Sequence, residues 1–470
     1  MAVKKPTLFA APLANNGSKW SIGTETNVMK GLSQFHDPLI NWSVESYSID
    51  SLGESIALVV RNPSEDMAVT PRVDIYLVSA DNSVKPKLLT GSFNAISDSP
   101  VFIKDGKYLA WLQMETLGYE KSVAREWDCS PESIVWSANG QTIFAVATDQ
   151  GNNIIFAINA TTGNCTRMTD AGSAMGLGTL GENQLLFQYT EQNKCVDIHI
   201  LDIETKEMRR LTDVNSDKLR NVYIGQAEYF WFKGALGDQV HGWIIKPLQF
   251  NTEKKYPLAL VVHGGPQASI QNIFTSTMWN SNIFANTGFV TVQINFHGST
   301  GYGKNFTDSI KHHPDGMVAL GASYGGYTLN WFNANTKRFK ALVCHAGIFS
   351  TPGAWYGTNE LWLPEHDFGG TPYDPKARSN HEEFNPERFA NEFATPTLFI
   401  HGGSDYRIGV EQSLAPFTLL RRKNIPTKFV YFPDEDHHIS SDVDQIKWLT
   451  EVLLWISEHT NTTLPYNLNQ

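Results

Sequence analysis

The sequence of 470 residues is poor in charged side chains and contains no block of Lys or Arg. Charged residues make up 18% of the chain, below the roughly 25% of a typical soluble domain. The net charge of −11 and the scattered basic residues argue against a nucleic acid or an anionic membrane surface as a partner. Hydrophobic residues, at 41%, supply enough material for large cores, which excludes a disordered or fibrous chain.

Long apolar runs are also absent from the sequence. The longest, Pro257–Val262, has the length of a strand and falls far below the roughly 20 residues that a membrane-spanning helix needs. We therefore expect no membrane span. The chain length itself corresponds to two or three domains.

Cysteine is scarce, and its spacing does not suit a metal site. Four cysteines are too few for a disulfide framework, although one pair could form in an oxidising compartment. The adjacent histidines His312-His313 and His437-His438 lack the i, i+4 spacing of metal ligands on a helix. We expect neither a metal nor another cofactor. The cysteines are Cys129, Cys165, Cys195 and Cys344.

The N-terminal segment Met1–Ala10 superficially resembles a signal peptide, because it is basic at its start. Its apolar part is short and carries Pro6, with Pro12 just beyond, so a surface strand fits better. Six Asn-x-Ser/Thr sequons would suit a secreted protein, but an Asn-rich chain forms several by chance. Composition therefore leaves the location open. The sequons begin at Asn16, Asn41, Asn159, Asn164, Asn305 and Asn461.

The first half of the chain reads as short alternating strands separated by Gly, Asn and Asp turns. The clearest strands are residues 55–60, 74–78, 142–147, 154–158 and 184–189. Triplets that end in Thr90, Thr169 and Thr212 close strand pairs, and the last two are 43 residues apart. This spacing is the length of one four-stranded propeller blade, so it favours a β-propeller over a β-sandwich. The step from Thr90 to Thr169 is 79 residues, near two such periods, yet no marker lies midway.

From about Glu228 onward, strands alternate with helical stretches, which indicates a mostly parallel sheet with helices on both faces. Strands are expected at residues 258–262, 289–294, 317–320, 341–344, 397–400 and 428–432. Helices are expected at residues 324–333, 410–423 and 443–459. The apolar stripe of the last helix should face the core. It consists of Val443, Ile446, Leu449, Val452, Leu453 and Ile456.

The most specific local motif is Gly-Ala-Ser-Tyr-Gly-Gly at residues 321–326. It directly follows an expected strand and directly precedes an expected helix, which is the context of a nucleophile elbow. A bare G-x-S-x-G arises often by chance or marks a tight turn. The flanking strand and helix favour Ser323 as a nucleophile.

A serine hydroxyl needs a base to remove its proton, and the base needs an acid to orient it. In an α/β-hydrolase the chain order is Ser, then Asp or Glu, then His. Asp405 follows the strand at 397–400, and His437 follows the strand at 428–432. Alone, these two residues would be read as a turn-former and a loop residue. Because all three candidates fall at the carboxyl ends of parallel strands, where ligands bind, we favour a catalytic role.

Acyl transfer also needs N–H donors for the developing oxyanion. The amide of Tyr324, directly after the candidate nucleophile, is one such donor. The loop His263–Pro266 can present a Gly amide, although a Gly-Pro sequence also forms ordinary turns. We expect His263 itself to pack or hydrogen-bond locally.

These motifs resemble the prolyl oligopeptidase clan of serine peptidases, in which a β-propeller precedes an α/β-hydrolase domain. The resemblance is closest to the acylaminoacyl-peptidase and dipeptidyl-peptidase branch, and within it to secreted fungal dipeptidyl peptidases. It covers nearly the whole chain and is most specific in the second half. The phrases that carry it are residues 240–243 (VHGW), 256–266, 295–303 (NFHGSTGYG), 321–327, 338–345, 364–370, 401–407 and 432–437 (FPDEDH).

The resemblance implies an activity and a set of site residues. It implies release of dipeptides from the free N-terminus of peptide substrates by a serine-type exopeptidase that forms an acyl-enzyme, and it implies secretion. The residues that it assigns are Ser323 as nucleophile, Asp405 as orienting acid, His437 as base, and Tyr324 and Gly265 as donors of oxyanion amides.

The chain also departs from the family. The family has further blades before the point where this chain starts, so we expect an incomplete, apparently truncated β-propeller at residues 1–227 and an α/β-hydrolase peptidase domain at 228–470. His297 and His438 stand where the family has Arg and Trp. A crossover helix is missing between Asn305 and Met317, and we expect this to lower stability and activity.

Two other hypotheses stay open. A catalytically impaired, truncated variant would act at most as a binding protein. An acylaminoacyl peptidase or esterase of the same clan would share the mechanism and differ in the leaving group. A serine-directed fluorophosphonate separates an assembled triad from an impaired one, because only an activated serine reacts.

Overall fold

The computed structural model describes residues 7–17, 19–32, 46–61, 72–91, 96–103, 106–114, 123–124, 126–234, 237–275, 278–309, 320–460 and 462–464. The chain divides into two compact units. The first consists of Met1–Ala147, Asn153–Tyr189 and Ile198–Thr212, and the second of Thr148–Asn152, Thr190–Asp197 and Asp213–Gln470. The domain division at residue 228 stays a prediction.

The N-terminal part of the chain forms four-stranded antiparallel sheets, as expected for a β-propeller. One sheet has the order β5-β6-β7-β8. Two further sets of four, β11–β14 and β15–β18, are joined by a single parallel bridge between Asn153 and Ser173. The strands are β5 (Tyr47–Ile49), β6 (Ser55–Val60), β7 (Asp74–Ser79), β8 (Lys87–Leu88), β11 (Pro131–Trp136), β12 (Thr142–Asp149), β13 (Asn152–Asn159), β14 (Cys165–Arg167), β15 (Ser173–Leu180), β16 (Gln184–Glu191), β17 (Lys194–Asp202) and β18 (Met208–Arg210).

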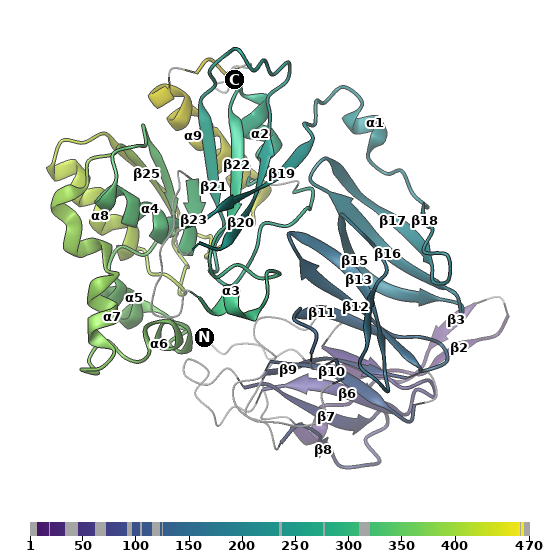
Figure 1. Ribbon diagram of the computed structural model, residues 1–470. Coiled ribbons are helices and arrows are strands. Elements are labelled where there is room, and N and C mark those ends of the chain that lie inside the picture. The colour runs from purple at the N-terminus through teal and green to yellow at the C-terminus, as the bar shows by residue number, and fades with distance from the viewer. Residues whose placement is uncertain are drawn as a thin grey trace. The chain divides into compact units, whose positions relative to one another are not determined.

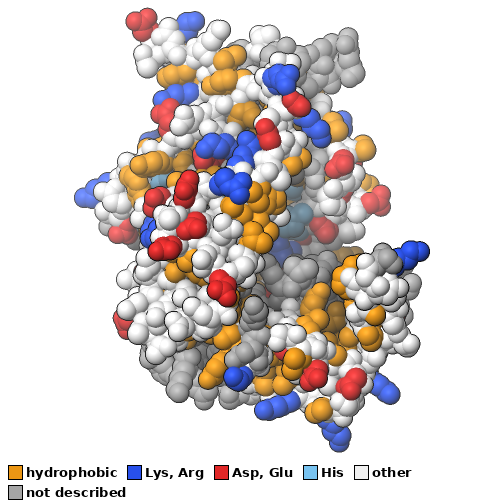
Figure 2. Space-filling model, turned by 90° about the vertical axis from the view of Figure 1, so that its right-hand side faces the viewer, with side chains coloured by type: hydrophobic (Ala, Val, Ile, Leu, Met, Phe, Trp, Pro, Cys, Tyr) orange, Lys and Arg blue, Asp and Glu red, His pale blue; other side chains and the backbone are white. Residues whose placement is uncertain are grey.

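Two-stranded antiparallel sheets also lie in this part of the chain. They are β1 (Phe9–Ala10) with β4 (Thr26–Asn27), β2 (Leu13–Asn15) with β3 (Trp20–Ile22), and β9 (Ile96–Phe102) with β10 (Leu109–Met114), besides the short helix η1 (Lys30–Leu32). Figure 2 shows one face of the molecule, on which hydrophobic side chains lie exposed among acidic and basic ones.

The sequons at Asn16, Asn159, Asn164 and Asn305 are exposed, whereas Asn41 and Asn461 lie outside the described residues.

The repeated threonines have a structural reason. Each lies two residues after the last strand of a four-stranded sheet, and its hydroxyl oxygen accepts a hydrogen bond from a backbone N–H of the third strand. The bonds join Ile75 to Thr90 (2.9 Å), Ile155 to Thr169 (3.1 Å) and Ile198 to Thr212 (2.9 Å). The threonine therefore continues the hydrogen bonding between the third and fourth strands past the end of the fourth. It does so at the same place in each of the three sets of four strands.

The C-terminal part contains an eight-stranded sheet in the order β19-β20-β22-β21-β23-β24-β25-β26 (Figure 1). β20 is antiparallel to both neighbours, and the pairs from β22 to β26 are parallel. This is the strand order of an α/β-hydrolase, and it confirms the expected fold class. The strands are β19 (Ala227–Lys233), β20 (Gln239–Ile245), β21 (Leu258–Val262), β22 (Val290–Asn295), β23 (Leu320–Ala322), β24 (Leu342–His345), β25 (Thr397–Gly402) and β26 (Thr427–Phe432).

Helices cover both faces of this sheet. At the end of β24, the thiol of Cys344 donates to Gly326 O of α4 (3.4 Å), and the next residue, His345, lies against Trp448 of α9 at 6.3 Å. Because successive side chains of a strand point to opposite faces, α4 and α9 lie on opposite sides of the sheet (Figure 1). The helices are α1 (Ser216–Leu219), α2 (Ser281–Asn286), α3 (Lys304–Asp308), α4 (Tyr324–Asn335), α5 (Thr351–Gly357), α6 (Trp362–Phe368), α7 (Arg378–Glu383), η2 (Pro386–Glu392), α8 (Glu411–Arg422) and α9 (Asp442–Thr460).

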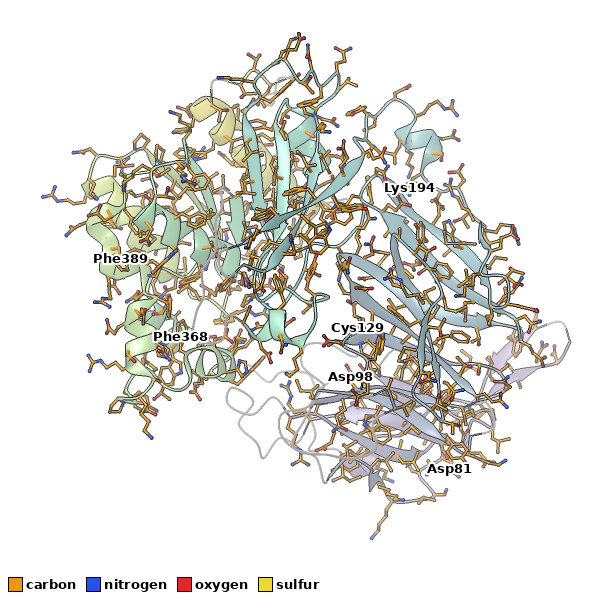
Figure 3. The ribbon with its side chains drawn as sticks, in the orientation of Figure 1. Asp81, Asp98, Cys129, Lys194, Phe368 and Phe389 are labelled. Carbon is orange, nitrogen blue, oxygen red and sulfur yellow. The ribbon has the colours of Figure 1, made fainter. Side chains whose placement is uncertain are left out.

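The segment between β24 and β25 adds helices α5 to α7 and η2 beside α4. Phe389 of η2 packs edge-on against Trp331 of α4 at 5.5 Å, and Phe368, at the end of α6, stacks on His381 of α7 at 4.4 Å. Figure 3 labels Phe389 and Phe368. None of the helices in the described ranges has the length and hydrophobicity that crossing a membrane requires.

Two expectations about this sheet need correction or stay open. Val443 and Ile446 are 74% and 68% exposed, so the predicted apolar stripe of α9 is wrong in its first turn. The buried face is formed instead by the later turns, in which Trp448 and Trp455 join the aliphatic residues. The expected strand at 317–320 shares only Leu320 with β23. Residues 310–319 of the crossover, with the His312-His313 pair, lie outside the described residues.

Candidate active site

Ser323 occupies the turn between β23 and α4 with a backbone conformation that non-glycine residues seldom adopt. Its φ is 58° and its ψ is −121°. The Ser323 N–H donates to His345 O at 3.0 Å, and the Ser323 carbonyl accepts from Tyr327 N at 2.9 Å. Such a strained residue persists only when its surroundings fix it, and it is typical of functional sites.

The glycines around Ser323 are required by close backbone approaches. A Cβ on Gly321 would lie 2.6 Å from the carbonyl carbon of Gly325, and one on Gly325 would lie 2.6 Å from Val262 O. A Cβ on Gly326 would lie 2.6 Å from the Cα of Gly347. Gly321 therefore lets the turn fold back on its own helix, and Gly325 and Gly326 let it approach the ends of neighbouring strands, which fixes Ser323 at the edge of the sheet.

Asp405 and His437 meet at the same edge, after the parallel strands β25 and β26. His437 Nδ1 donates to Asp405 Oδ2 at 2.7 Å. The other carboxylate oxygen accepts from the N–H groups of Arg407 (3.0 Å) and Ile408 (2.9 Å). Burial alone would raise the pKa of Asp405, but hydrogen bonds from His401 and His437 and the backbone bring it below its ordinary value. An ionised Asp405 fixes the proton on Nδ1 of His437 and leaves Nε2 as the basic nitrogen.

His401 is a neighbour of Asp405 that the sequence did not single out. It is fully buried, its Nε2 donates to Ile408 O (2.8 Å), and its Nδ1 accepts from the Ser413 hydroxyl (2.7 Å). The same Nε2 lies 3.5 Å from Asp405 Oδ2. His401 therefore shapes the loop that carries Asp405. The sequence signal that could have indicated this contact is the position of His401, four residues before Asp405 and near the end of a buried strand.

His438 is placed differently from His437. Its N–H donates to Asp436 Oδ1 at 2.8 Å, and its ring stands nearly perpendicular to that of His437, with the centroids 5.2 Å apart. The His438 side chain is exposed, whereas His437 is buried. Of the two adjacent histidines, His437 is therefore the partner of Asp405.

The loop after β21 lies directly beside Ser323. A Cβ on Gly264 would be 3.2 Å from the Cβ of Ser323, and Gly265 has a φ of 127° that favours glycine. The Gly264 carbonyl accepts a hydrogen bond from Nδ1 of His263 at 2.7 Å. In a planar trans peptide the N–H points opposite to the carbonyl, so the N–H of Gly265 points away from the His263 ring.

His263 is itself held on its other side. Its Nε2 accepts from the Ser299 hydroxyl at 2.9 Å, and its ring is stacked on Phe296 with centroids 4.3 Å apart. Phe296 also stacks on the ring of Tyr324, at 5.8 Å. Burial lowers the pKa of His263 to about 4, so the ring is neutral near pH 7. His263 hydrogen-bonds locally, as expected. Its bond to the Gly264 carbonyl orients the Gly264–Gly265 peptide.

Comparisons with known proteins show the family of the chain. The sequence profile of the prolyl oligopeptidase family matches residues 275–316 and 312–463. A protein of Trichophyton schoenleinii named dipeptidyl-peptidase 5 is 30% identical over 513 aligned residues, which cover 96% of this chain and 70% of that protein.

The chain belongs to the prolyl oligopeptidase family. The dipeptidyl-peptidase 5 of Schizosaccharomyces pombe is 35% identical over 456 residues, or 87% of this chain. This family member spans 65% of the length of the S. pombe protein and 64% of the probable dipeptidyl-peptidase 5 of Aspergillus clavatus.

Similar solved structures support the fold. The acylaminoacyl peptidase of Pyrococcus horikoshii matches with a TM-score of 0.72 at 19% identity, over 88% of this chain and 71% of that one. A puromycin-hydrolyzing peptidase of Mycobacterium tuberculosis matches with a TM-score of 0.67 at 18% identity, over 91% and 70% of the two chains.

Proposed function

We propose that this chain is a serine peptidase that releases dipeptides from the free N-terminus of peptides. Ser323 is the nucleophile, His437 the general base and Asp405 the acid that orients it. The 2.7 Å hydrogen bond between His437 and Asp405, at the sheet edge where the Ser323 turn also ends, carries the proposal. The names of the 30–35% identical relatives support the dipeptidyl-peptidase activity.

In the acylation step, Ser323 Oγ attacks the scissile carbonyl carbon while its proton passes to His437 Nε2. The oxyanion that forms accepts hydrogen bonds from the N–H groups of Tyr324 and Gly265. When the intermediate collapses, the C–N bond breaks and the proton on His437 passes to the leaving amine. Water then repeats the sequence on the acyl-enzyme, which releases the dipeptide and restores Ser323.

The oxyanion donors give a prediction for His263. In His263→Ala the Gly264 carbonyl loses its hydrogen-bond donor, so the Gly265 N–H is no longer fixed in orientation. Loss of one oxyanion donor typically costs about 10²–10³ in rate, and we expect kcat to fall by that factor while KM changes little. Steady-state kinetics on a chromogenic dipeptide substrate measures both constants.

The matched control for that variant is Thr300→Ala. Thr300 neighbours Ser299, but its hydroxyl donates to Ser269 at 3.4 Å and has no bond to His263. This variant should keep the wild-type kcat. Equal losses in the two variants would mean that general loosening of the loop, and not the Gly265 amide, causes the effect.

The substrate class is tested with a pair of peptides that differ only at the N-terminus. We expect release of a dipeptide from the unblocked peptide and no release from its N-acetylated form, as followed by mass spectrometry. Preference for the acetylated peptide would instead make the protein an acylaminoacyl peptidase. Cleavage of neither, with no labelling of Ser323 by a fluorophosphonate, would identify an impaired variant.

A further inference from the structure

The loop that carries His437 contains a buried acid, Glu435. Its residue is only 5% exposed, and the catalytic steps above do not use it. Its neighbours Asp434 and Asp436 are exposed, as expected for acidic residues in a loop after a strand. A carboxylate is buried in this way only when other groups satisfy it, so its contacts indicate what it does.

The Glu435 carboxylate closes the loop around His437. Oε2 accepts from the N–H of Ser440 (2.7 Å) and from its hydroxyl (3.0 Å), and Oε1 accepts from the N–H of Ser441 (2.9 Å). Burial alone would raise the pKa of Glu435, but these donors bring it below its ordinary value, so it is charged at neutral pH. The segments before and after His437 are thus joined by three charge-assisted hydrogen bonds.

The main chain of Glu435 reaches the other loop of the site. Its carbonyl accepts from the N–H of Ser404 at 2.8 Å, and Ser404 directly precedes Asp405. The two loops approach so closely here that a Cβ on Gly402 would lie 2.6 Å from Glu435 O. A Cβ on Gly403 would lie 2.4 Å from Pro433 O, and the Gly403 N–H donates to Phe432 O at 2.7 Å. Glu435 therefore contacts both the loop of the base and the loop of the acid.

We propose that Glu435 is a positioning residue that holds the imidazole of His437 against Asp405. The proposal rests on the catalytic roles proposed above for that pair. Without the carboxylate, the bonds that join residue 435 to residues 440 and 441 across His437 would be lost, so the loop would hold the imidazole less firmly. A displacement of the base by about 1 Å can cost on the order of 10²-fold in rate, so a loosened loop should be visible in kinetics.

The test compares Glu435→Gln with a matched variant. Gln keeps the size of the side chain, but its amide nitrogen is a donor and so opposes one of the donors that the carboxylate now binds. We expect the rate constant for fluorophosphonate labelling of Ser323, and kcat, to fall by about 10–100-fold. KM should stay within about twofold, because no substrate contact changes.

The matched control is Glu451→Gln in α9. Glu451 is also a buried carboxylate, 7% exposed, and it pairs with Lys428 and Lys447, away from the loops of the site. Glu451→Gln should lower the melting temperature about as much as Glu435→Gln does, but it should not slow the labelling of Ser323. Ser440→Ala removes only the hydroxyl bond and should slow labelling by no more than about threefold.

A readout that needs no catalysis is the downfield proton resonance of the hydrogen-bonded Nδ1 of His437, assigned by its absence in Asp405→Ala. It should be sharp in the wild type and in Glu451→Gln, and broadened or lost in Glu435→Gln. An unchanged resonance and wild-type labelling in folded Glu435→Gln would overturn the proposal. So would an equal loss in Glu451→Gln. If no peptide is cleaved but the resonance follows this pattern, the proposed function fails and the role of Glu435 stands.

Discussion

Replacing Ser323 by alanine should lower peptide hydrolysis by about a million-fold and leave the fold intact. Covalent catalysis depends on the Ser323 hydroxyl, and loss of a triad nucleophile typically costs a factor of that order. The fold should persist because the turn is fixed by backbone contacts, among them the bonds of Ser323 to His345 and Tyr327, which alanine retains. The measurement is kcat/KM on a dipeptide substrate, with circular dichroism and thermal melting to confirm folding.

Ser457→Ala in α9 is a suitable control for that variant. The Ser457 hydroxyl donates to Leu454 O within the helix at 3.0 Å, so its loss should leave hydrolysis unchanged. Turnover of Ser323→Ala near the wild-type value would contradict the assignment of the nucleophile. It would also exclude an acyl-enzyme on Ser323.

The elements that depend on local sequence were predictable. β21 has the predicted bounds, and β26 begins one residue earlier than predicted. The turn at Ser323 could be predicted because its signal, a serine among glycines between a strand and a helix, is local in the sequence. The threonine markers were found as a repeat before their hydrogen bonds gave the reason, since one contact recurs at one place in each sheet.

The supporting contacts could not be predicted, because they join segments that are distant in the chain. The bond of His263 to Ser299, for example, spans 36 residues. Glu435 stands in an acidic stretch in which nothing but burial distinguishes it from its neighbours. The prediction that the start of α9 is buried was wrong for a related reason. A helical period shows which residues share a face, but not how far that face extends over the sheet.

Replacing His437 by alanine should reduce hydrolysis by a factor of similar order to the loss of Ser323, about a million-fold, since residues of a triad act as a unit. Replacing His438 by tryptophan should keep activity within a few-fold. The two histidines are adjacent and chemically identical, so only their surroundings distinguish them. Only His437 is hydrogen-bonded to Asp405 through Nδ1, at 2.7 Å, and an imidazole without this partner is neither oriented nor fixed in its tautomer.

The same pair of variants tests the assignment of the base by pH. Activity of the wild type should fall on acidification, because the base must be neutral to accept the proton of Ser323. Asp405 does not cause that fall, since its carboxyl has a pKa below the ordinary range and stays ionised. His438→Trp should stay active and still lose activity on acidification, because it retains the proposed base. Loss of turnover in His438→Trp, or turnover that survives in His437→Ala, would assign the base to His438 instead.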